Sequence, residues 1–336
     1  MNKKLAVVIL NWNGQLFLEK FLPSVISYSF LEAEIIVADN HSTDDSISFL
    51  QANFPSVKII LLDKNYGFAG GYNKALKQVE AEYYVLLNSD VEVTKNWLTP
   101  MIDLLENDKN VVACQPKIKD YNNKNYYEYA GAAGGFIDKL GYPLCRGRIF
   151  DKIEEDTGQY DDVTEIFWAS GACLFIRAKE FYEIGGLDEF FFAHMEEIDL
   201  CWRLKNKGYK IMFCPTSTVY HVGGGTLNKT KPQKTFLNFR NSLLTLHKNL
   251  PKGNRFIILL ARLLLDGLAG IKFLFSGKTT HTWAIVRSHF SFFNGLHQNK
   301  LKRTPSLTPN LTGLINKSVV VSYYLKKTNK FNDFLK

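Results

Sequence analysis

The polar residues that close the apolar run from Tyr83 to Asp90 could bind a metal-bound phosphate. The run, YYVLLNSD, is rich in aromatic and branched residues, which predicts a buried strand, and it ends on Asn88, Ser89 and Asp90. In an open α/β sheet, ligands bind just beyond the carboxyl ends of the strands. A carboxylate at that place can hold a divalent cation against a phosphate, so Asp90 is the first candidate for a functional site.

Three other segments place candidate groups at the ends of predicted elements. Asp39 closes the apolar run EIIVADN, where its carboxylate could accept from a nucleobase or a ribose, or the turn could instead cap the next helix. The glycine-rich stretch from Asn65 to Asn73 matches neither GxGxxG nor a P-loop, and a tight turn is the simpler interpretation. His221 precedes three glycines and could ligate a transition metal, although a lone histidine is more often structural.

Two adjacent glutamates open the predicted helix EEIDLCWRLKNKG. Acidic residues are favoured in a first helical turn, and that alone explains most such cases, but the same field would keep Glu196 or Glu197 ready to accept a proton. The preceding segment, DEFFFAHM, is aromatic, as a wall for a sugar ring would be. Further along the helix, Asp199 and Arg203 have the spacing of an ion pair, and Gly208 stands at the expected C-terminal cap.

Alternating strands and helices must position these groups. Four apolar runs (LAVVIL, EIIVADN, VKIILLD and YYVLLNSD) alternate with helical patterns, which predicts βαβ units and a parallel sheet covered on both faces. After Trp97, the runs VVACQPKI and EIFWASGACLFIRA predict longer strands in a mixed or antiparallel half. The expected fold class is therefore α/β with a mostly parallel, mixed sheet.

The C-terminal section is helical and basic. From His247 to Lys336 there are 15 Lys and Arg residues and 2 acidic residues, a net charge of +13, so residues 1–246 carry 8 − 13 = −5. In the run RFIILLARLLLDGLAGIKFLF, Arg255, Arg262 and Asp266 fall within about 40° of one another on an otherwise apolar helix. Its charged residues argue against a membrane span. We expect this helix to pack on the body of the protein, with insertion into a membrane interface as the alternative.

Cysteine usage and the N-terminus indicate a cytoplasmic protein. The five cysteines are odd in number, scattered and never arranged as CxxC, which argues against a disulfide framework or a zinc site. The run LAVVIL is too short for a signal peptide. The basic charge is spread out and no nucleic-acid reader motif is present, so nucleic acid is not expected as a partner.

Taken in order, these motifs resemble the family 2 glycosyltransferases of the GT-A fold, most closely the rhamnosyltransferase-like branch. The matching segments span about residues 4–230 and are VVILNWNG, VADNHSTDDS, NYGFAGGYN, YYVLLNSD, WASGACLFIRA, FFFAHMEEIDLCWRLKNKGY and YHVGGGT. The resemblance implies a Rossmann-like GT-A catalytic domain over residues 1–235. A helical, basic extension would follow over residues 236–303, and then a basic tail over residues 304–336 whose structure the sequence does not indicate.

The resemblance also implies a nucleotide and metal site. Asp39 would read the nucleotide base, and the pocket would be lined by Asn11, Gly67 and Asn73. The triplet Asn88-Ser89-Asp90 stands where the family has its DXD motif, with Asn in place of the first Asp. Asp90 would contact Mn²⁺ or Mg²⁺, and His221 matches a histidine that completes the metal site in some relatives.

The remaining implied roles concern the sugar and the acceptor. Trp168, Ser170 and Gly171 would contact the donor sugar or the acceptor. Glu197 falls where the family's catalytic Asp usually stands and would be the catalytic base, with Glu196 as the alternative. The longer side chain of Glu changes the geometry expected of that base.

The implied reaction is the inverting transfer of a sugar from a UDP- or dTDP-linked donor, for example dTDP-rhamnose, to a hydroxyl of a saccharide acceptor. The expected setting is cell-surface polysaccharide synthesis. If a polyprenyl diphosphate carries the acceptor, the basic section would dock the enzyme on the anionic face of the cell membrane. The alternatives are a non-catalytic module of the same fold that binds a nucleotide sugar or a polysaccharide, and a nucleic-acid-binding protein that uses the basic section.

Overall fold

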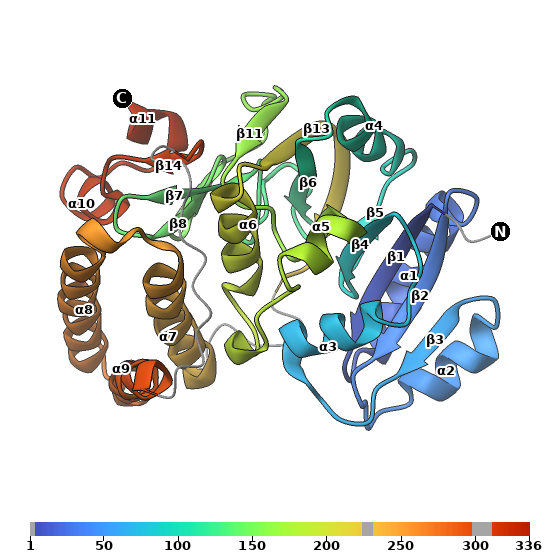
Figure 1. Ribbon diagram of the computed structural model, residues 1–336, viewed down its shortest axis with the longest axis horizontal. Coiled ribbons are helices and arrows are strands. Elements are labelled where there is room, and N and C mark those ends of the chain that lie inside the picture. The colour runs from blue at the N-terminus through green and yellow to red at the C-terminus, as the bar shows by residue number, and fades with distance from the viewer. Residues whose placement is uncertain (1–3, 224–230, 298–310) are drawn as a thin grey trace.

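A nine-stranded mixed sheet forms the centre of the molecule (Figure 1). The computed structural model describes residues 4–223, 231–297 and 311–336, so Gly224, Gly225 and the first part of the basic tail lie outside the described residues. Four parallel strands form the N-terminal half of the nine-stranded sheet, in the order β3-β2-β1-β4. They are β1 (Leu5–Asn11), β2 (Ala33–Asp39), β3 (Lys58–Leu61) and β4 (Tyr83–Asn88). The predicted parallel half is confirmed.

The other half of the sheet is mixed, as the sequence predicts. It contains β5 (Val91–Val93), β6 (Val111–Asp120), β11 (Thr164–Ile166), β12 (Cys173–Arg177) and β13 (Lys210–His221). Strand β12 lies antiparallel between β4 and β6, and β13 runs parallel to β6. This places the end of β13, and with it His221, near the end of β4.

One predicted strand is wrong. The run EIFWASGACLFIRA is not continuous but forms β11 and β12, which occupy different positions in the sheet. Strand β11 pairs with β13, whereas β12 pairs with β4 and β6. The intervening loop contains Trp168, Ser170 and Gly171, whose side chains and backbone bond outside the sheet ladder.

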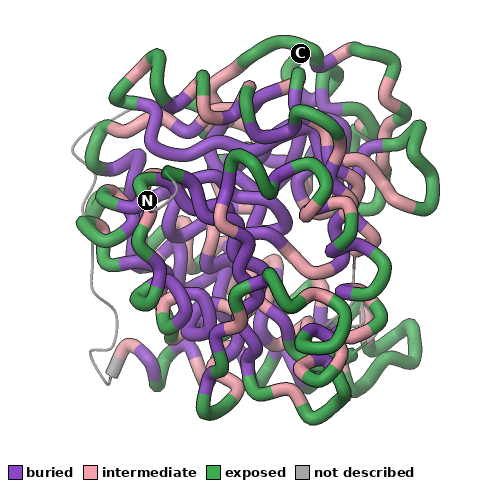
Figure 2. Tube along the Cα trace, turned by 90° about the vertical axis from the view of Figure 1, so that its right-hand side faces the viewer, coloured by how far each residue is buried: buried purple, intermediate pink, exposed green. Residues whose placement is uncertain are grey.

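Helices cover both faces of the sheet, and each face has its own buried core. Figure 2 shows the buried residues gathered in the interior of the molecule, with exposed residues around them. Helices α1 (Gln15–Ser29), α2 (Ser46–Asn53) and α4 (Thr99–Asn107) pack on one face. Helices α3 (Gly67–Leu76), α5 (Ala178–Glu183) and α6 (Glu196–Asn206) pack on the other. Alternation along β1 explains the two cores, because Val7 belongs to one and Val8 to the other.

A second, five-stranded sheet lies beside the first, and one of its strands comes from the C-terminal part of the chain. Its order is β10-β9-β8-β7-β14. The strands are β7 (Gly135–Asp138), β8 (Pro143–Cys145), β9 (Arg148–Ile149), β10 (Lys152–Ile153) and β14 (Leu314–Ile315). The short helices α10 (Val319–Tyr324) and α11 (Phe331–Leu335) dock on it: Asp138 accepts a hydrogen bond from the backbone N–H of Val319, and Phe331 is buried. The described part of the basic tail is therefore folded.

Three long helices, α7 (Pro232–Asn249), α8 (Lys252–Phe275) and α9 (Thr279–His297), form a group next to α6, with α8 outermost (Figure 1). The boundary expected after residue 235 falls inside α7. Among the described helices, none is long and apolar enough to cross a bilayer.

Candidate functional site

Three parallel strands end together and bring the first candidate groups to one edge of the sheet. In the strand register Asn11 pairs with Asp39, and Leu10 pairs with Asn88. Asn11 Nδ2 donates to Asp39 Oδ2 at 3.0 Å, and the backbone N–H of Ser42 donates to Asp39 Oδ1 at 2.8 Å. Asp39 thus holds the following turn, and it keeps lone pairs for a base or ribose. Asn11 Oδ1 is buried without a hydrogen-bond partner, so this edge retains an unused acceptor.

Beyond the same edge, Asp90, His221 and Glu128 form a buried line of charged groups. His221 Nε2 lies 3.1 Å from Asp90 Oδ1, and Nδ1 lies 3.3 Å from Glu128 Oε2. Burial opposes a charged imidazole, but the carboxylates of Glu128 and Asp90 outweigh it and raise the pKa of His221 to about 10. Burial would raise the pKa of Asp90, yet the charge of His221 holds it below the usual value. Asn88 Nδ2 lies 3.4 Å from His221 Nε2. The structure thus places the predicted residues Asn88, Asp90 and His221 together.

This line fits a divalent cation in its donor types. A carboxylate and an imidazole suit Mn²⁺, and a second carboxylate behind the imidazole is the usual means of orienting a histidine ligand. His221 would bind a metal only after losing its ring proton. Within the described ranges, no three His, Cys, Asp or Glu side chains form a complete metal site, so oxygens of a bound substrate would have to supply the remaining ligands.

The glycine-rich loop is closed by a contact that the sequence did not reveal. Gly67 has φ +70°, and a Cβ there would lie 2.5 Å from the ring of Phe192. The Phe192 carbonyl accepts from the N–H groups of Phe68 (2.7 Å) and Ala69 (3.3 Å), so it occupies the N-terminus of α3. Asn40 Nδ2 donates to the Gly67 carbonyl at 3.0 Å and fixes the loop from β2. The tight-turn interpretation of this loop is thus supported.

Asn73, which lies in α3, bonds to the segment before α6. Its Nδ2 donates to the carbonyl of Leu187 at 2.7 Å, and its Oδ1 accepts from the Leu187 N–H at 3.0 Å. Nδ2 also lies 3.2 Å from Glu189 Oε1. The described geometry therefore uses Asn73 to join α3 to the segment before α6, and its contact with a nucleotide stays a prediction.

In the loop between β11 and β12, two of the three candidates make structural bonds. Trp168 Nε1 donates to the Phe136 carbonyl at 2.8 Å, and Ser170 Oγ donates to the Ala130 carbonyl. Gly171 is different, because a Cβ there would lie 3.1 Å from the Phe68 ring and 3.9 Å from Glu197 Cβ. The adjacent Ala172 carbonyl accepts from the Asn88 N–H at 3.0 Å. Gly171 therefore lies between the sheet edge that ends on Asn88 and the glutamates of α6.

The two glutamates of α6 differ in their surroundings. Glu196 is buried, and burial together with Glu197 raises its pKa well above the usual value. Glu197 is partly exposed, and burial raises its pKa to about 7. Oε2 of each lacks a hydrogen-bond partner. A carboxylate with an unpaired oxygen and a pKa near neutrality has the properties of a general base, and Glu197 is the less buried of the two residues, although its Oε2 is itself buried.

The segment that leads into these glutamates is strained. Phe192, His194 and Met195 all have positive φ, at 66°, 69° and 72°. Non-glycine residues rarely adopt this conformation, and such strain persists only where surrounding structure imposes it.

Helix α7 supplies that structure. Asn241 Nδ2 lies within hydrogen-bond distance of the carbonyls of Phe191 (3.0 Å), Ala193 (2.9 Å) and His194 (2.7 Å). Arg240 Nη2 donates to the carbonyls of Phe190 and Phe191 at 3.0 and 2.9 Å. Both side chains are buried. The sequence reasoning missed these residues, because nothing local connects Asn241 to a segment almost fifty positions earlier.

Helix α7 also holds α6 itself. Lys248 Nζ donates to Asp188 at 2.6 Å and to Asp199 at 2.8 Å, and Asn249 Nδ2 donates to Asp199 at 2.8 Å. The predicted Asp199–Arg203 pair is present, at 2.8 Å. Burial would raise the pKa of Asp199, but Arg203 and Lys248 keep it below the usual value. Helix α7 therefore contacts the chain on both sides of Glu197, before it at residues 188–194 and after it at Asp199.

Comparison with known sequences agrees with this geometry. The family model described as Glycosyl transferase family 2 matches residues 6–181. The N-acetylglucosaminyl-diphospho-decaprenol L-rhamnosyltransferase of Mycobacterium tuberculosis is 24% identical over 66% of this chain and 76% of its own length. The GalNAc(5)-diNAcBac-PP-undecaprenol beta-1,3-glucosyltransferase of Campylobacter jejuni is 34% identical over 53% of this chain and 62% of its own length.

Solved structures share the fold. S. aureus TarS 1–349 in complex with UDP-GlcNAc superposes with a TM-score of 0.56 and 15% identity, over 88% of this chain and 82% of that one. The mannosyltransferase PcManGT from Pyrobaculum calidifontis, in complex with GDP-Man and Mn²⁺, gives 0.53 and 13%, over 87% and 88%. The chain therefore belongs to glycosyl transferase family 2, in its rhamnosyltransferase-like branch, and has the GT-A fold.

Proposed function

We propose that this chain is an inverting, metal-dependent glycosyltransferase that uses a UDP- or dTDP-linked sugar, with dTDP-rhamnose as the first donor to test. The acceptor is a hydroxyl of a saccharide carried on a polyprenyl diphosphate at the cytoplasmic face of the membrane, in cell-surface polysaccharide synthesis. The names of the two relatives, which specify decaprenol- and undecaprenol-linked compounds, support the acceptor class.

One observation carries the proposal: Glu197, whose Oε2 has no hydrogen-bond partner and whose pKa is about 7, has its Cβ beside Gly171, next to the loop residue Ala172 that bonds to Asn88. A general base placed next to a diphosphate-binding edge is what a direct displacement requires. In that displacement Glu197 takes the proton of the acceptor hydroxyl. The oxygen bonds to the anomeric carbon from the side opposite the diphosphate, whose bond to that carbon breaks.

Asp90 and His221 would hold the divalent cation, which when bound supplies positive charge to the diphosphate leaving group. The protein's own part is to orient the groups: Glu128 lies behind His221, and Asn88 lies beside it. Because the displacement is direct, the protein needs no nucleophile of its own.

The test is release of nucleoside diphosphate from a panel of UDP-, dTDP- and GDP-sugars, with and without Mn²⁺. We expect slow hydrolysis of one donor, dependent on the metal and reduced at least about a hundredfold in Asp90→Ala. Asp103→Ala, at an exposed carboxylate of α4, is the matched control and keeps the wild-type rate.

Two results would speak against the proposal. Donor binding without release, even when a saccharide acceptor is added, would favour the non-catalytic module of the same fold. Neither binding nor release of any donor would contradict the nucleotide-sugar site itself.

A further inference from the structure

Helix α8 is built with its polar residues inside and its apolar residues outside. Arg262, Asp266 and Gly270 are its buried residues. The guanidinium of Arg262 donates to the Leu140 carbonyl at 3.0 Å and lies 3.8 Å from the centre of the Tyr142 ring. The polar stripe predicted from the sequence is thus present, and it faces the protein.

The opposite side of α8 exposes a continuous row of large apolar side chains. Leu264 and Leu268 are 65% and 62% exposed, and the row runs from Phe256 to Phe275. At 100° per residue, its members fall within an arc of about 120° that contains no charged residue. Soluble monomers rarely expose a contiguous apolar surface of this length, so the row indicates a partner.

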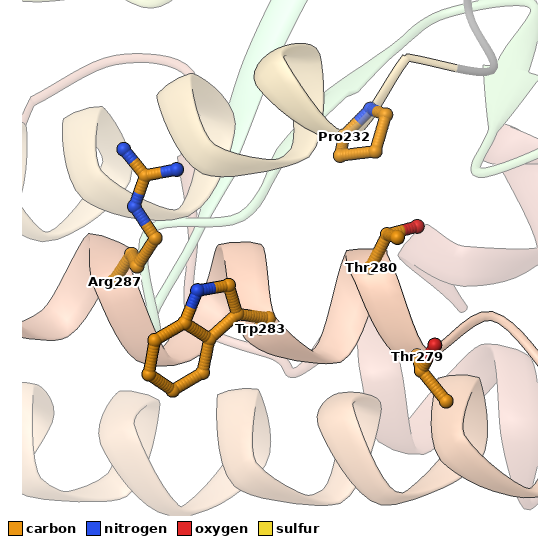
Figure 3. Close-up of a pocket in the computed structure, with 5 residues that line it drawn as sticks. All are labelled: Pro232, Thr279, Thr280, Trp283 and Arg287. Atoms are coloured by element: carbon orange, nitrogen blue, oxygen red, sulfur yellow. The ribbon is translucent and has the colours of Figure 1, made fainter.

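Helix α9, which packs against α8, exposes a second apolar stripe. Trp283, Val286, Phe290 and Phe293 recur at helical spacing and are exposed. Trp283 and Arg287 of α9 help to line an open surface pocket of about 460 Å³, together with Thr279, Thr280 and Pro232 of α7 (Figure 3). An exposed tryptophan beside an arginine is the pairing that suits the headgroup level of a bilayer.

The charges around these two rows are mostly positive. Lys252, Lys272, Lys278 and Arg287 are exposed at the ends and edges of α8 and α9. Within the described part of residues 247–336, the two acidic side chains are neutralised: Asp266 is buried near His289, and Asp333 pairs with Lys336. The exposed Asp151 also lies at this rim, beside Lys272, so the rim is mostly cationic. An apolar surface with such a rim matches the interface of an anionic membrane.

We propose that the outward faces of α8 and α9, here called the docking face, lie in the headgroup region of an anionic phospholipid membrane. The helices rest on the bilayer and do not cross it, in keeping with the buried polar stripe of α8. This deepens the proposed function, because an acceptor carried on a membrane lipid requires the enzyme at that surface. It is tested separately from catalysis.

The test is flotation of the purified full chain with vesicles of phosphatidylcholine, with and without phosphatidylglycerol, at low and high salt. We expect binding to the phosphatidylglycerol vesicles at low salt. The double variant Leu264→Glu/Leu268→Glu should lower it about tenfold or more, because it puts charge into the apolar row. The matched control Leu31→Glu/Val163→Glu changes two exposed apolar residues elsewhere (93% and 51% exposed) and should bind like the wild type.

A second readout locates the contact. Lipids brominated on their acyl chains should quench the fluorescence that Trp283 contributes, and Trp283→Phe should remove that quenching whereas Trp12→Phe should not. Donor hydrolysis is measured in parallel on all variants and should remain at the wild-type rate, so loss of docking is distinguished from loss of the enzyme.

The proposal is overturned if the wild type ignores the anionic vesicles at low salt, or if the Leu264/Leu268 variant binds them as tightly as the wild type. The alternative occupant of the same face is a second copy of the chain. In that case the wild type would sediment as a dimer without vesicle binding and the variant as a monomer, which would also overturn it.

Discussion

Glu196 and Glu197 are identical in chemistry, and their surroundings give them different tasks. Burial raises the pKa of Glu196 well above its usual value, whereas Glu197 is partly exposed and burial raises its pKa to about 7. Glu197→Gln removes the base and should lower the turnover number by about 10²–10⁴. Glu196→Gln keeps the shape of a side chain that is more deeply buried than Glu197 and should change turnover less than about tenfold. Steady-state rates of the two matched variants check this, and equal losses would contradict the assignment.

The pH dependence of the wild type follows from the same residue. The base must be ionised to accept a proton, so kcat/KM should rise with pH and level off above about 7. The free energy of unfolding changes with pH in the opposite direction to kcat/KM. Because burial raises the pKa of Glu197 in the folded state, the folded protein resists its ionisation, and the free energy of unfolding falls as the pH rises through 7. The variant Glu197→Gln should show neither this rise of kcat/KM nor this fall of the free energy of unfolding with pH.

At the scale of elements, α7 supports the strained segment before α6, the helix that carries the proposed base. Asn241→Leu removes the donor that three carbonyls share, at a cost of about 1–3 kcal/mol in the free energy of unfolding. As a positioning residue, Asn241 should act through Glu197. We therefore expect a lower kcat with little change in donor affinity, and a shift in the acid limb of the pH profile.

The control for that prediction is Gln233→Leu, an exposed position on the same helix. It should change neither the unfolding free energy nor the profile. If Asn241→Leu loses stability but keeps the wild-type kcat and acid limb, α7 is only a structural support.

Local patterns were sufficient to predict most of the elements. The strands β1 to β4 are short apolar runs separated by helical patterns, and they were predicted because period and turn residues are local properties. The split between β11 and β12 was not predicted, because both halves are apolar and only their partners, β13 and β4, distinguish them. The pattern of residues also did not predict which face of α8 turns toward the protein. A narrow polar stripe on an apolar helix is compatible with either face turned inward, and Tyr142 and Leu140 decide which one is.

The site was predicted only where a residue ends an element. Asp90, His221 and Glu197 follow or begin predicted strands and helices, and the structure brings Asp90 and His221 to 3.1 Å. Glu128 lies in a loop, and Phe192 contributes through its carbonyl, so neither carries a signal in the sequence. The contribution of Asn241 can be recognised only when the fold shows that α7 lies beside the segment before α6.

At the scale of the whole molecule, charge and apolar surface are divided between two ends. Residues 1–246 carry a net charge of −5 and include the candidate site, whereas residues 247–336 carry +13 and include the docking face. An anionic surface would attract one end and repel the other. The body would thus be held away from the lipid while α8 and α9 touch it.

This division leads to a prediction about salt. Attraction between exposed charges is screened over about 10 Å at 0.1 M salt and about 3 Å at 1 M. Transfer to a polyprenyl-linked acceptor in anionic vesicles should therefore decline steeply as salt rises, since docking depends on exposed Lys and Arg. Transfer to a short water-soluble acceptor should decline much less, since Asp90, His221 and Glu128 are buried and only weakly screened. Initial rates for the two acceptors across one salt series test this. Parallel declines would mean that salt acts on the catalytic site, and that the basic section does not recruit the enzyme.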